Sequence, residues 1–501
     1  MAKKVCFFLQ RRFAYLGHAL AYNLLKNGSA KEICAYVTLR SSYDFIKNQK
    51  DLHYTGLLLD EDIYKDALKK GSVNFEYLNK LEATYGLPNL WPYLYLDRVL
   101  MNGQLIREYP YNRPTASFDD MLRIIEHSAK TIEKFLDDEK PDAIVFSVIG
   151  SLAPLLLYQM AKKKGIQTIC IDLTRIKNGV GLSEDFKTFS WVDSIYEKLQ
   201  AGTLKSQYLE NAEKFIEEFR KSPEPYLKEL KPEFNNQVGR AANISFLKPK
   251  QLIRTIFWHI RQLYLDLKQK ENDYTDIKIW WIVFDKFMRK SRGLFGYHNF
   301  WEKIPKKENF AYYPLHYETE TATLLYAPLY VNQIELIKQT ARALPVGMYL
   351  YVKEHPRMIG YRKRNFYRDI KKIPNVRLIQ PTYYGPTLVK EAKIIVTITS
   401  TAGWEGVMLG KPVITFGDIY YNKLPNVSRC RSFEDLALLI KNKLANTGHD
   451  EKSLIHYVAA LMEESVNIDY VNLWAFPDEK ALLADPAMIE LAKLLHLKMN
   501  I

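Results

Sequence analysis

Short apolar runs alternate with amphipathic stretches along the first part of the chain. The runs are rich in β-branched and aromatic residues, which predicts buried strands at 3–10, 31–39, 141–150 and 166–173. The stretches between them carry apolar residues at helical spacing, which predicts helices at 11–29, 117–140 (capped by Ser117) and 151–165. A strand, a helix and a second strand follow one another at the start, which indicates a parallel βαβ unit. We therefore predict a Rossmann-like domain over residues 1–190.

The same rhythm returns in the second half of the chain. Strand patterns lie at 348–356, 375–381, 394–401 and 411–417, with helical patterns at 330–344 and 384–393. This predicts a second Rossmann-like domain over 310–445. Strand signals are missing from 191–309, which we interpret as a helical insertion. The tail 446–501 is expected to be helical and to pack back across both domains.

The length of 501 residues fits two or three domains better than one core. The predicted fold class is α/β, with two Rossmann-like domains facing each other across a cleft and a helical insertion between them. One large group of glycosyltransferases and some sugar-nucleotide epimerases share this plan. In them the second domain normally holds the nucleotide.

The chain is basic, with 71 Lys and Arg against 57 Asp and Glu and a net charge of +14. Such a charge attracts polyanions, whether nucleic acid, anionic lipid headgroups or phosphate-bearing substrates. No RNA-recognition, zinc-finger or helix-turn-helix signature occurs, so nucleic acid is the least favoured partner. The four cysteines lie far apart without metal-binding spacing, which is typical of free thiols in a reducing cytosol.

Membrane contact, if any, is predicted at the surface. No apolar run reaches the roughly 20 residues of a transmembrane helix, and the run after the basic N-terminus is too short for a signal peptide. Residues 246–270 combine large apolar side chains with many Lys and Arg, which is typical of a helix in a membrane interface. An ordinary surface helix packed on the core is the alternative. We expect a cytoplasmic protein, peripheral at the inner face of the cytoplasmic membrane if the first interpretation holds.

The stretch MYLYVKEHPRMIG places polar residues directly after a predicted buried strand. Lys353, Glu354, His355 and Pro356 stand there, and Pro356 favours an extended conformation at the residue before it. The imidazole would then be held at the strand's carboxyl end, where open α/β sheets bind ligands. An imidazolium or ammonium at this place stabilises the charge on a departing nucleotide phosphate. A solvated lysine and a loop histidine are the alternative.

A second predicted strand, 394–401, runs into hydroxyl residues and then into a helix. Ser400 and Thr401 stand at the expected helix start, where hydroxyls, backbone N–H groups and the helix dipole favour an anion. Gly403 would let a phosphate approach the backbone, and Glu405 would accept hydrogen bonds from ribose hydroxyls. The alternative is a helix capped by Ser400, with Glu405 near its positive end and no ligand.

Four segments that include these motifs resemble the capsule polysaccharide biosynthesis family: YYPLHYETETATLLYAP, NQIELI, ALPVGMYLYVKEHP and TITSTAGWEGVMLGKPVITFGDIYY. A looser resemblance covers YLGHALAYNL and residues 141–176. That family includes bacterial β-Kdo transferases, which use CMP-Kdo. The resemblance implies a GT-B transferase whose His-Pro motif (His355, Pro356) and Ser/Thr motif (Ser400, Thr401) bind the CMP moiety. Bacterial sialyltransferases of similar fold carry both motifs, which supports a CMP-linked donor without naming the sugar.

The first domain is expected to supply catalytic groups and acceptor contacts. Asp172, Glu184 and Asp185 are carboxylates near strand ends, and one of them could act as a general base or as the nucleophile of a two-step reaction. A turn-forming Asp172 and a surface pair Glu184–Asp185 are the alternatives. Arg175 suits the carboxylate of a 2-keto sugar acid, because a guanidinium binds carboxylates in a bidentate manner.

Two loops hold further candidates for substrate binding. Gln10, Tyr15 and His18 follow the first predicted strand and are expected to line the cleft. His316 and Glu318 stand at the entrance to the second domain, where they would touch donor or acceptor. A structural hydrogen bond across the hinge is the alternative for this second pair.

We predict a glycosyltransferase of surface or capsular polysaccharide synthesis that needs no metal and no cofactor. It would move a sugar, such as Kdo or a related 2-keto sugar acid, from a CMP-activated donor to a glycolipid or polysaccharide acceptor. Metal independence is expected because the second domain carries no Asp-x-Asp motif or carboxylate cluster. The alternatives are a polyol-phosphate transferase, a sugar-nucleotide epimerase of the same plan, and a non-catalytic membrane-surface scaffold.

Overall fold

A computed structural model describes most of the chain. The described residues are 3–69, 71–103, 113–114, 116–224, 253–254, 256–257, 260–261, 263–264, 279–295, 300–302, 308–318, 320–446, 450–469 and 479–499. Most of the segment 246–270, predicted as an interfacial helix, therefore lies outside the described residues.

The chain divides into two compact units. Unit 1 comprises Met1–Gly103, Asn112–Tyr208 and Tyr457–Ile501, and unit 2 comprises Gln104–Tyr111 and Leu209–His456. Unit 1 thus extends past residue 190 and takes up the end of the chain. Each unit is built around its own mainly parallel sheet, which confirms the predicted α/β class with two Rossmann-like domains.

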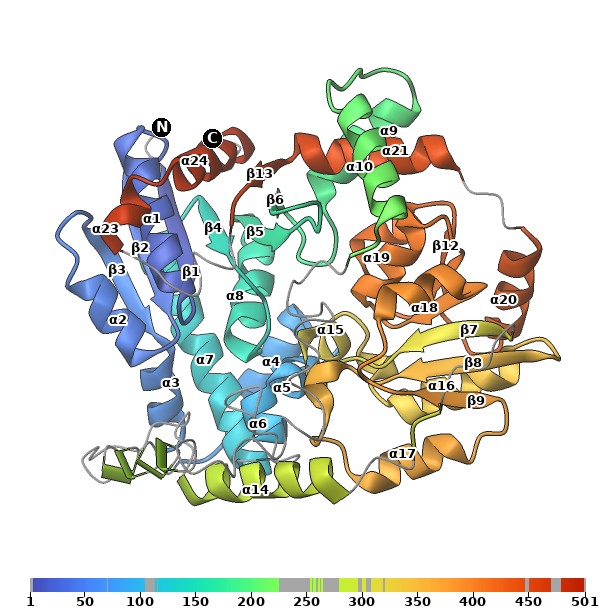
Figure 1. The fold of residues 1–501 in the computed structure, drawn as a ribbon. Coiled ribbons are helices and arrows are strands. Elements are labelled where there is room, and N and C mark those ends of the chain that lie inside the picture. The colour runs from blue at the N-terminus through green and yellow to red at the C-terminus, as the bar shows by residue number, and fades with distance from the viewer. Residues whose placement is uncertain are drawn as a thin grey trace. The chain divides into compact units, whose positions relative to one another are not determined.

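The sheet of unit 1 has the strand order β13-β6-β5-β4-β1-β2-β3 (Figure 1). Its strands are β1 (Lys4–Leu9), β2 (Glu32–Val37), β3 (Tyr54–Leu59), β4 (Ala143–Phe146), β5 (Gln167–Leu173), β6 (Gly179–Ser183) and β13 (Ser465–Asn467). The order β5-β4-β1-β2-β3 is parallel, whereas β6 runs antiparallel to β5 and β13 antiparallel to β6. The chain changes direction across the sheet between β1 and β4, which makes this the topological switch point of unit 1.

Helices cover both faces of this sheet, as continuous burial of β1 from Val5 to Leu9 requires. They are α1 (Phe13–Lys26), α2 (Arg40–Lys47), α3 (Asp60–Ala67), α4 (Phe75–Tyr85), α5 (Trp91–Leu96), α6 (Arg98–Asn102), α7 (Phe118–Glu139), α8 (Leu152–Lys163), α9 (Ser190–Gln200), α23 (Glu479–Leu483) and α24 (Pro486–Lys498). Helix α21 (Glu451–Glu463) begins in unit 2 and ends in unit 1. Ser117 caps α7 in a capping box with Asp120, as predicted.

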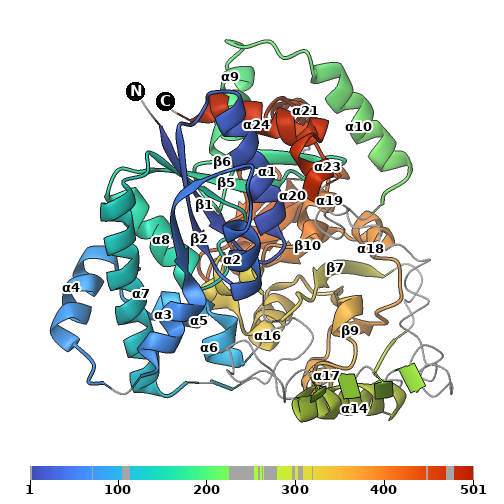
Figure 2. The ribbon, with the colours of Figure 1, turned by 90° about the vertical axis from the view of Figure 1, so that its left-hand side faces the viewer.

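The end of the chain completes the fold of unit 1. Figure 2 shows α24 beside α1, and the Asn23 side chain of α1 donates a hydrogen bond to the carbonyl of Leu483 at 3.2 Å. Leu491 and Leu495 of α24 join the same apolar core as Leu20 and Leu24 of α1. The tail is also not wholly helical, because β13 extends the sheet beyond β6.

The sheet of unit 2 has the order β12-β11-β10-β7-β8-β9, and each neighbouring pair is parallel. Its strands are β7 (Asn309–Pro314), β8 (Met348–Lys353), β9 (Val376–Ile379), β10 (Ile394–Thr397), β11 (Val413–Thr415) and β12 (Val427–Arg429). The helices around it are α10 (Leu209–Lys221), α14 (Ile279–Phe295), α15 (Thr321–Leu324), α16 (Gln333–Ala343), α17 (Arg364–Lys371), α18 (Gly385–Glu391), α19 (Thr401–Met408) and α20 (Leu436–Ala445).

Two observations complete the comparison with the predicted class. Cys6, Cys34, Cys170 and Cys430 are buried and unpaired by disulfides, as predicted. Within the part of the chain that the structure describes, no helix is both long and apolar enough to span a bilayer.

Candidate functional site

The carboxyl ends of β7, β8 and β10 meet at one edge of the unit 2 sheet, because these adjacent strands are parallel. Figure 1 shows β7 and β8 side by side. Strands β8 and β9 extend the sheet on one side of β7, and β10, β11 and β12 extend it on the other. The switch point therefore lies between β7 and β10, and parallel sheets bind ligands at such a point. The predicted residues of this unit all follow these three strands.

His316, two residues beyond β7, connects the loop after β7 to the loop after β10 across the switch point. Its Nε2 atom accepts a hydrogen bond from the backbone N–H of Thr399, after β10, at 3.1 Å. Burial lowers the pKa of His316 to about 3, so the ring is neutral and carries its proton on Nδ1. His316 was predicted to touch substrate. The structure favours the structural alternative, although the bond joins two loops of one sheet rather than crossing a hinge.

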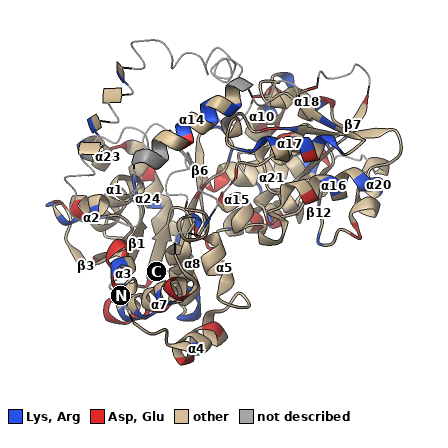
Figure 3. Ribbon diagram, turned by 90° about the horizontal axis from the view of Figure 1, so that it is seen from below, with Lys and Arg blue, Asp and Glu red and all other residues tan. Residues whose placement is uncertain are grey.

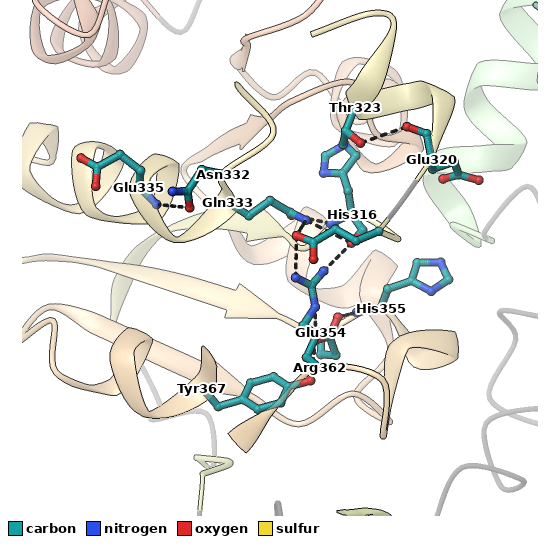
Figure 4. A network of polar contacts seen from close by, with 11 residues as sticks. His316, Glu320, Thr323, Asn332, Gln333, Glu335, Glu354, His355, Arg362 and Tyr367 are labelled. Atoms are coloured by element: carbon teal, nitrogen blue, oxygen red, sulfur yellow. Dashed lines mark hydrogen bonds and ion pairs between the residues drawn. The ribbon is translucent and has the colours of Figure 1, made fainter. Parts of the chain in front are cut away.

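Arg362 lies at the centre of a buried polar network below this edge (Figure 4). It forms ion pairs with Glu318 (Nη1–Oε1, 2.7 Å) and Glu354 (Nε–Oε2, 2.9 Å), and its Nη2 donates a hydrogen bond to the carbonyl of His316 at 2.6 Å. Burial acts to lower the pKa of Arg362, but the carboxylates of Glu354 and Glu318 raise it above its usual value. The charged guanidinium therefore joins the segments that follow β7 and β8.

The contacts of Glu354 and Glu318 contradict the ligand-binding roles predicted for them. Glu354 is fully buried, and besides Arg362 it accepts a hydrogen bond from the Tyr367 hydroxyl at 2.6 Å. Glu318 accepts one from the Gln333 amide at 2.7 Å. The carboxylate of Glu354 is thus used inside the protein, because a buried charge requires a partner. Glu318 is partly exposed, and its Oε1 atom contacts both Arg362 and Gln333. Arg362 stands among other basic residues, Arg357, Lys363 and Arg364, and no local pattern distinguishes it as the buried partner of Glu354.

The same network presents His355 at the sheet edge. The His355 backbone N–H donates to Glu354 Oε1 at 2.7 Å, and its carbonyl accepts from the N–H of Met358 at 2.8 Å. Its half-buried ring lies edge-on to Tyr317, with 5.8 Å between centroids. In Figure 4 the ring points away from the Arg362 network. The position is the one predicted from Pro356, which begins a short 3-10 turn; the catalytic role stays a prediction.

Ser400 and Thr401 begin α19 beside this edge, but Ser400 does not cap the helix with its side chain. The Thr397 hydroxyl donates to Ser400 Oγ at 2.8 Å, and the Ser400 backbone N–H donates back to Thr397 Oγ1 at 3.2 Å. This excludes the simple capping alternative. The start of α19 therefore keeps its positive dipole end without a serine cap.

Gly403 does not have the predicted role of admitting a phosphate. It is buried, and a Cβ atom there would lie 2.3 Å from the Tyr421 hydroxyl oxygen. That hydroxyl donates to the Ser400 carbonyl at 2.8 Å. The glycine is required because a tyrosine 18 residues later crosses the first turn of α19, a contact that no local pattern reveals.

Lys353 and Glu405 are two buried titratable groups near the switch point, one basic and one acidic. Burial lowers the pKa of Lys353 to about 8, against the attraction of Glu354 and Glu405. Burial likewise raises the pKa of Glu405 to about 8, against Lys353. Among the described residues, the Lys353 ammonium has no hydrogen-bond acceptor and no carboxylate within ion-pair distance. Lys353 is thus a buried basic group, and its predicted contact with an anion stays a prediction.

Glu405 makes the stability of the protein depend on pH. Its pKa in the folded state is about 8, against 4.5 for an ordinary glutamate, so between these values the folded state holds a proton that the unfolded state has released. The free energy of unfolding must then fall as the pH rises through this window. We expect the free energy of unfolding of Glu405→Gln, relative to that of the wild type, to rise by on the order of 2–4 kcal/mol between pH 5 and pH 8. Urea denaturation at a series of pH values measures this difference. The control is Glu391→Gln, at an exposed position of α18, whose free energy of unfolding should differ from that of the wild type by the same amount at every pH. A difference that is independent of pH for Glu405→Gln would contradict the prediction.

In unit 1, Gln10 and Arg175 lie at the matching edge of the sheet. Gln10 Nε2 donates to Ser147 Oγ and to the Val148 carbonyl, both at 2.9 Å, and so joins the ends of β1 and β4. Arg175 follows β5 with φ +61°, a left-handed conformation that non-glycine residues seldom adopt. Asp172 is near the end of β5 and accepts a hydrogen bond from the next backbone N–H at 2.7 Å. These three predicted residues share the carboxyl edge.

Glu184 and Asp185 lie at the opposite edge, so their predicted catalytic role is not supported. They follow β6, which returns antiparallel to β5 and therefore ends where β5 begins. The Glu184 side chain is accordingly 3.4 Å from the Gln167 amide at the start of β5. The prediction assumed that every strand of this domain runs the same way.

On α1, His18 is buried and Tyr15 is partly buried against the apolar core. His18 is buried, its Nδ1 lies 2.9 Å from the Tyr54 hydroxyl, and burial lowers its pKa to about 4. Tyr15 packs against Phe45 with 4.4 Å between ring centroids. Their predicted contact with substrate is wrong because the side of α1 that carries them faces α2 and β3.

Comparison with known proteins adds a family match. Residues 298–435 match the family described as "Capsule polysaccharide biosynthesis protein". Protein FixF of Sinorhizobium fredii is 32% identical over 117 residues, which are 23% of this chain and 27% of FixF. The match thus spans little more than a quarter of that relative.

Solved structures with the same general plan are distant. Thermosulfurimonas dismutans KpsC, beta Kdo 2,7 transferase, is 12% identical with a TM-score of 0.33, covering 62% of this chain and 78% of that one. The beta Kdo 2,4 transferase of the same protein is 16% identical with a TM-score of 0.34, covering 64% and 80%. UDP-GlcNAc 2-epimerase from Neisseria meningitidis is 12% identical with a TM-score of 0.23, covering 92% and 98%. Similarities at these TM-scores carry no argument about chemistry.

Proposed function

We propose, from the premise that residues 298–435 belong to the capsule polysaccharide biosynthesis family, that this protein is a glycosyltransferase of capsular or surface polysaccharide synthesis. The donor is a nucleotide-activated sugar bound at the switch point of unit 2. The acceptor is a glycolipid or growing polysaccharide. The expected independence of metal and cofactor belongs to the same proposal.

One observation supports the donor site above all others. Lys353 ends β8, and His355 stands two residues beyond it. The uncapped start of α19 follows β10, and β8 and β10 flank β7 at the switch point. An ammonium, an imidazole and a helix N-terminus together match the negative charge of a nucleotide phosphate. The network of Arg362 holds the backbone of His355 in place, so its side chain is pre-positioned.

The reaction needs groups that stabilise the charge of the departing phosphate and a base that takes the proton of the acceptor hydroxyl. The bond between the anomeric carbon and the phosphate oxygen breaks, and its electron pair stays on the phosphate, where Lys353 and His355 stabilise it. The acceptor oxygen bonds to the anomeric carbon and loses its proton to a base. Of the three carboxylates predicted for this task, Asp172 fits best, since it alone lies at the carboxyl edge of the unit 1 sheet. Arg175 at that edge suits the carboxylate of a 2-keto sugar acid.

The His-Pro and Ser/Thr motifs favour a cytidine monophosphate leaving group, with Kdo or a related sugar acid as the sugar. A thermal-shift titration of the full chain with CMP, CDP and UDP tests this, because a ligand of the folded state raises the melting temperature. We expect CMP to give the largest shift and Lys353→Met to abolish it. A larger shift with UDP would favour an epimerase-like donor, and no shift with any nucleotide would favour a non-catalytic scaffold.

A further inference from the structure

Two segments of unit 2 expose large apolar side chains in a regular pattern. The described residues between 253 and 264 are helical, and Ile253, Ile256, Phe257, Ile260, Leu263 and Tyr264 are all exposed. Their spacings of three, four, seven, ten and eleven residues fall on one side of a helix. On α14, Val283, Phe284 and Phe287 are also exposed and share one side. Phe257 and Phe287 are 71% and 68% exposed, which is unusual for phenylalanine on the surface of a soluble protein.

The opposite side of α14 fastens the helix to the rest of unit 2. Arg289 Nη1 donates to the Tyr361 hydroxyl at 2.7 Å and its guanidinium lies 4.5 Å from the centre of that ring. Arg292 Nη1 donates to the Tyr361 carbonyl at 2.9 Å. The Arg289 carbonyl is so close to Gly360 that a Cβ there would meet it at 2.9 Å. These contacts attach α14 to the rest of unit 2 on the side opposite Val283 and Phe287.

The charges beside both apolar sides are cationic. Arg254 and Arg261 are exposed and lie beside the apolar side of the first segment, and Lys286 and Lys290 lie beside the apolar side of α14. Figure 3 shows Lys and Arg positions along α14 in blue. Asp285 is on the other side of α14, paired with Arg289 at 2.8 Å. None of the described residues on the two apolar sides is acidic. Lys and Arg in such positions reach headgroups while the apolar side chains enter the acyl boundary.

We propose that the surface formed by the described apolar residues between 253 and 264 and by the apolar side of α14 binds an anionic lipid bilayer. The combination of bulky apolar residues with purely cationic flanks complements anionic headgroups. It disfavours a second copy of this chain, because like charges would face each other across the interface. This proposal concerns where the protein sits and does not depend on the donor or the reaction proposed above.

Vesicle flotation with the full chain tests the proposal. We expect the wild type to float with vesicles of phosphatidylcholine and phosphatidylglycerol, to bind phosphatidylcholine alone much more weakly, and to lose affinity as the salt concentration rises. Phe257→Glu combined with Phe287→Glu should lower the partition constant by about tenfold or more. Arg254→Gln combined with Arg261→Gln should weaken binding to the anionic vesicles and flatten its salt dependence.

The matched control carries two glutamates at exposed apolar positions elsewhere in unit 2, Val346 and Leu438. Val346→Glu combined with Leu438→Glu should bind vesicles as the wild type does, and all variants should keep the wild-type melting temperature. Absence of flotation by the wild type would overturn the proposal. So would equal losses in the two glutamate variants. A wild-type dimer in lipid-free solution that Phe257→Glu and Phe287→Glu break, without flotation, would identify the surface as a contact between copies instead.

Discussion

Replacing His355 by alanine is expected to lower the rate of sugar transfer by about 100-fold or more while the protein stays folded. The ring is at the carboxyl edge of β8, two residues beyond Lys353, and the proposed donor would place its departing phosphate at this edge. Its backbone is held by Glu354 and the Met358 N–H, so removing the side chain leaves these contacts in place. Steady-state turnover with a CMP-activated sugar acid measures the effect.

The pattern of the loss separates a chemical role from a binding role. A group that stabilises only the developing charge affects kcat, whereas a group that only holds the donor affects KM. We expect kcat to fall and the thermal shift with CMP to shrink only in part. His127→Ala, a half-buried histidine of α7, is the control and should keep both. Wild-type kcat in His355→Ala would remove this residue from the mechanism.

The fold could be predicted because its strands are short buried runs. The patterns at 3–10, 31–39 and 348–356 became β1, β2 and β8, and each lies inside a parallel sheet covered on both faces. A strand buried on both sides must be apolar along its length, so its own residues reveal it. The turn at 174–178 was missed although the sequence carries a local signal for it: Asn178 and Gly179 form an Asn-Gly pair, which is typical of hairpin turns. That omission placed Glu184 and Asp185 at the wrong edge.

In the candidate site, too, the positions of residues could be predicted from the local sequence, whereas their side-chain partners could not. The positions of His355, Lys353 and Ser400 follow from the strands before them, and the structure places them at one edge as expected. The partners of Glu354, His316 and Gly403 are Arg362, Thr399 and Tyr421, which stand between 8 and 83 residues away in the sequence. A polar residue next to a strand end is equally compatible with binding a ligand and with a buried partner. Only the three-dimensional packing decides between them.

Replacing Arg362 by methionine is expected to cost about 3–5 kcal/mol of the free energy of unfolding, the largest stability effect we foresee for one substitution in unit 2. The buried carboxylate of Glu354 and the carbonyl of His316 would lose their partner, and Glu318 would lose its ion pair. Urea denaturation measures the loss. Arg368→Met, at an exposed position of α17, should change the free energy of unfolding by less than about 0.5 kcal/mol.

A double variant distinguishes loss of a partner from loss of a uniquely shaped site. Combining Arg362→Met with Glu354→Met removes both charges, and a buried ion pair replaced by apolar groups of similar size often regains stability. We therefore expect the double variant to recover much of the stability that Arg362→Met loses. It should not recover nucleotide binding or turnover, because the backbone N–H of His355 has then lost the carboxylate that orients it. Full activity in a stable double variant would show that the network of Arg362 serves the fold alone.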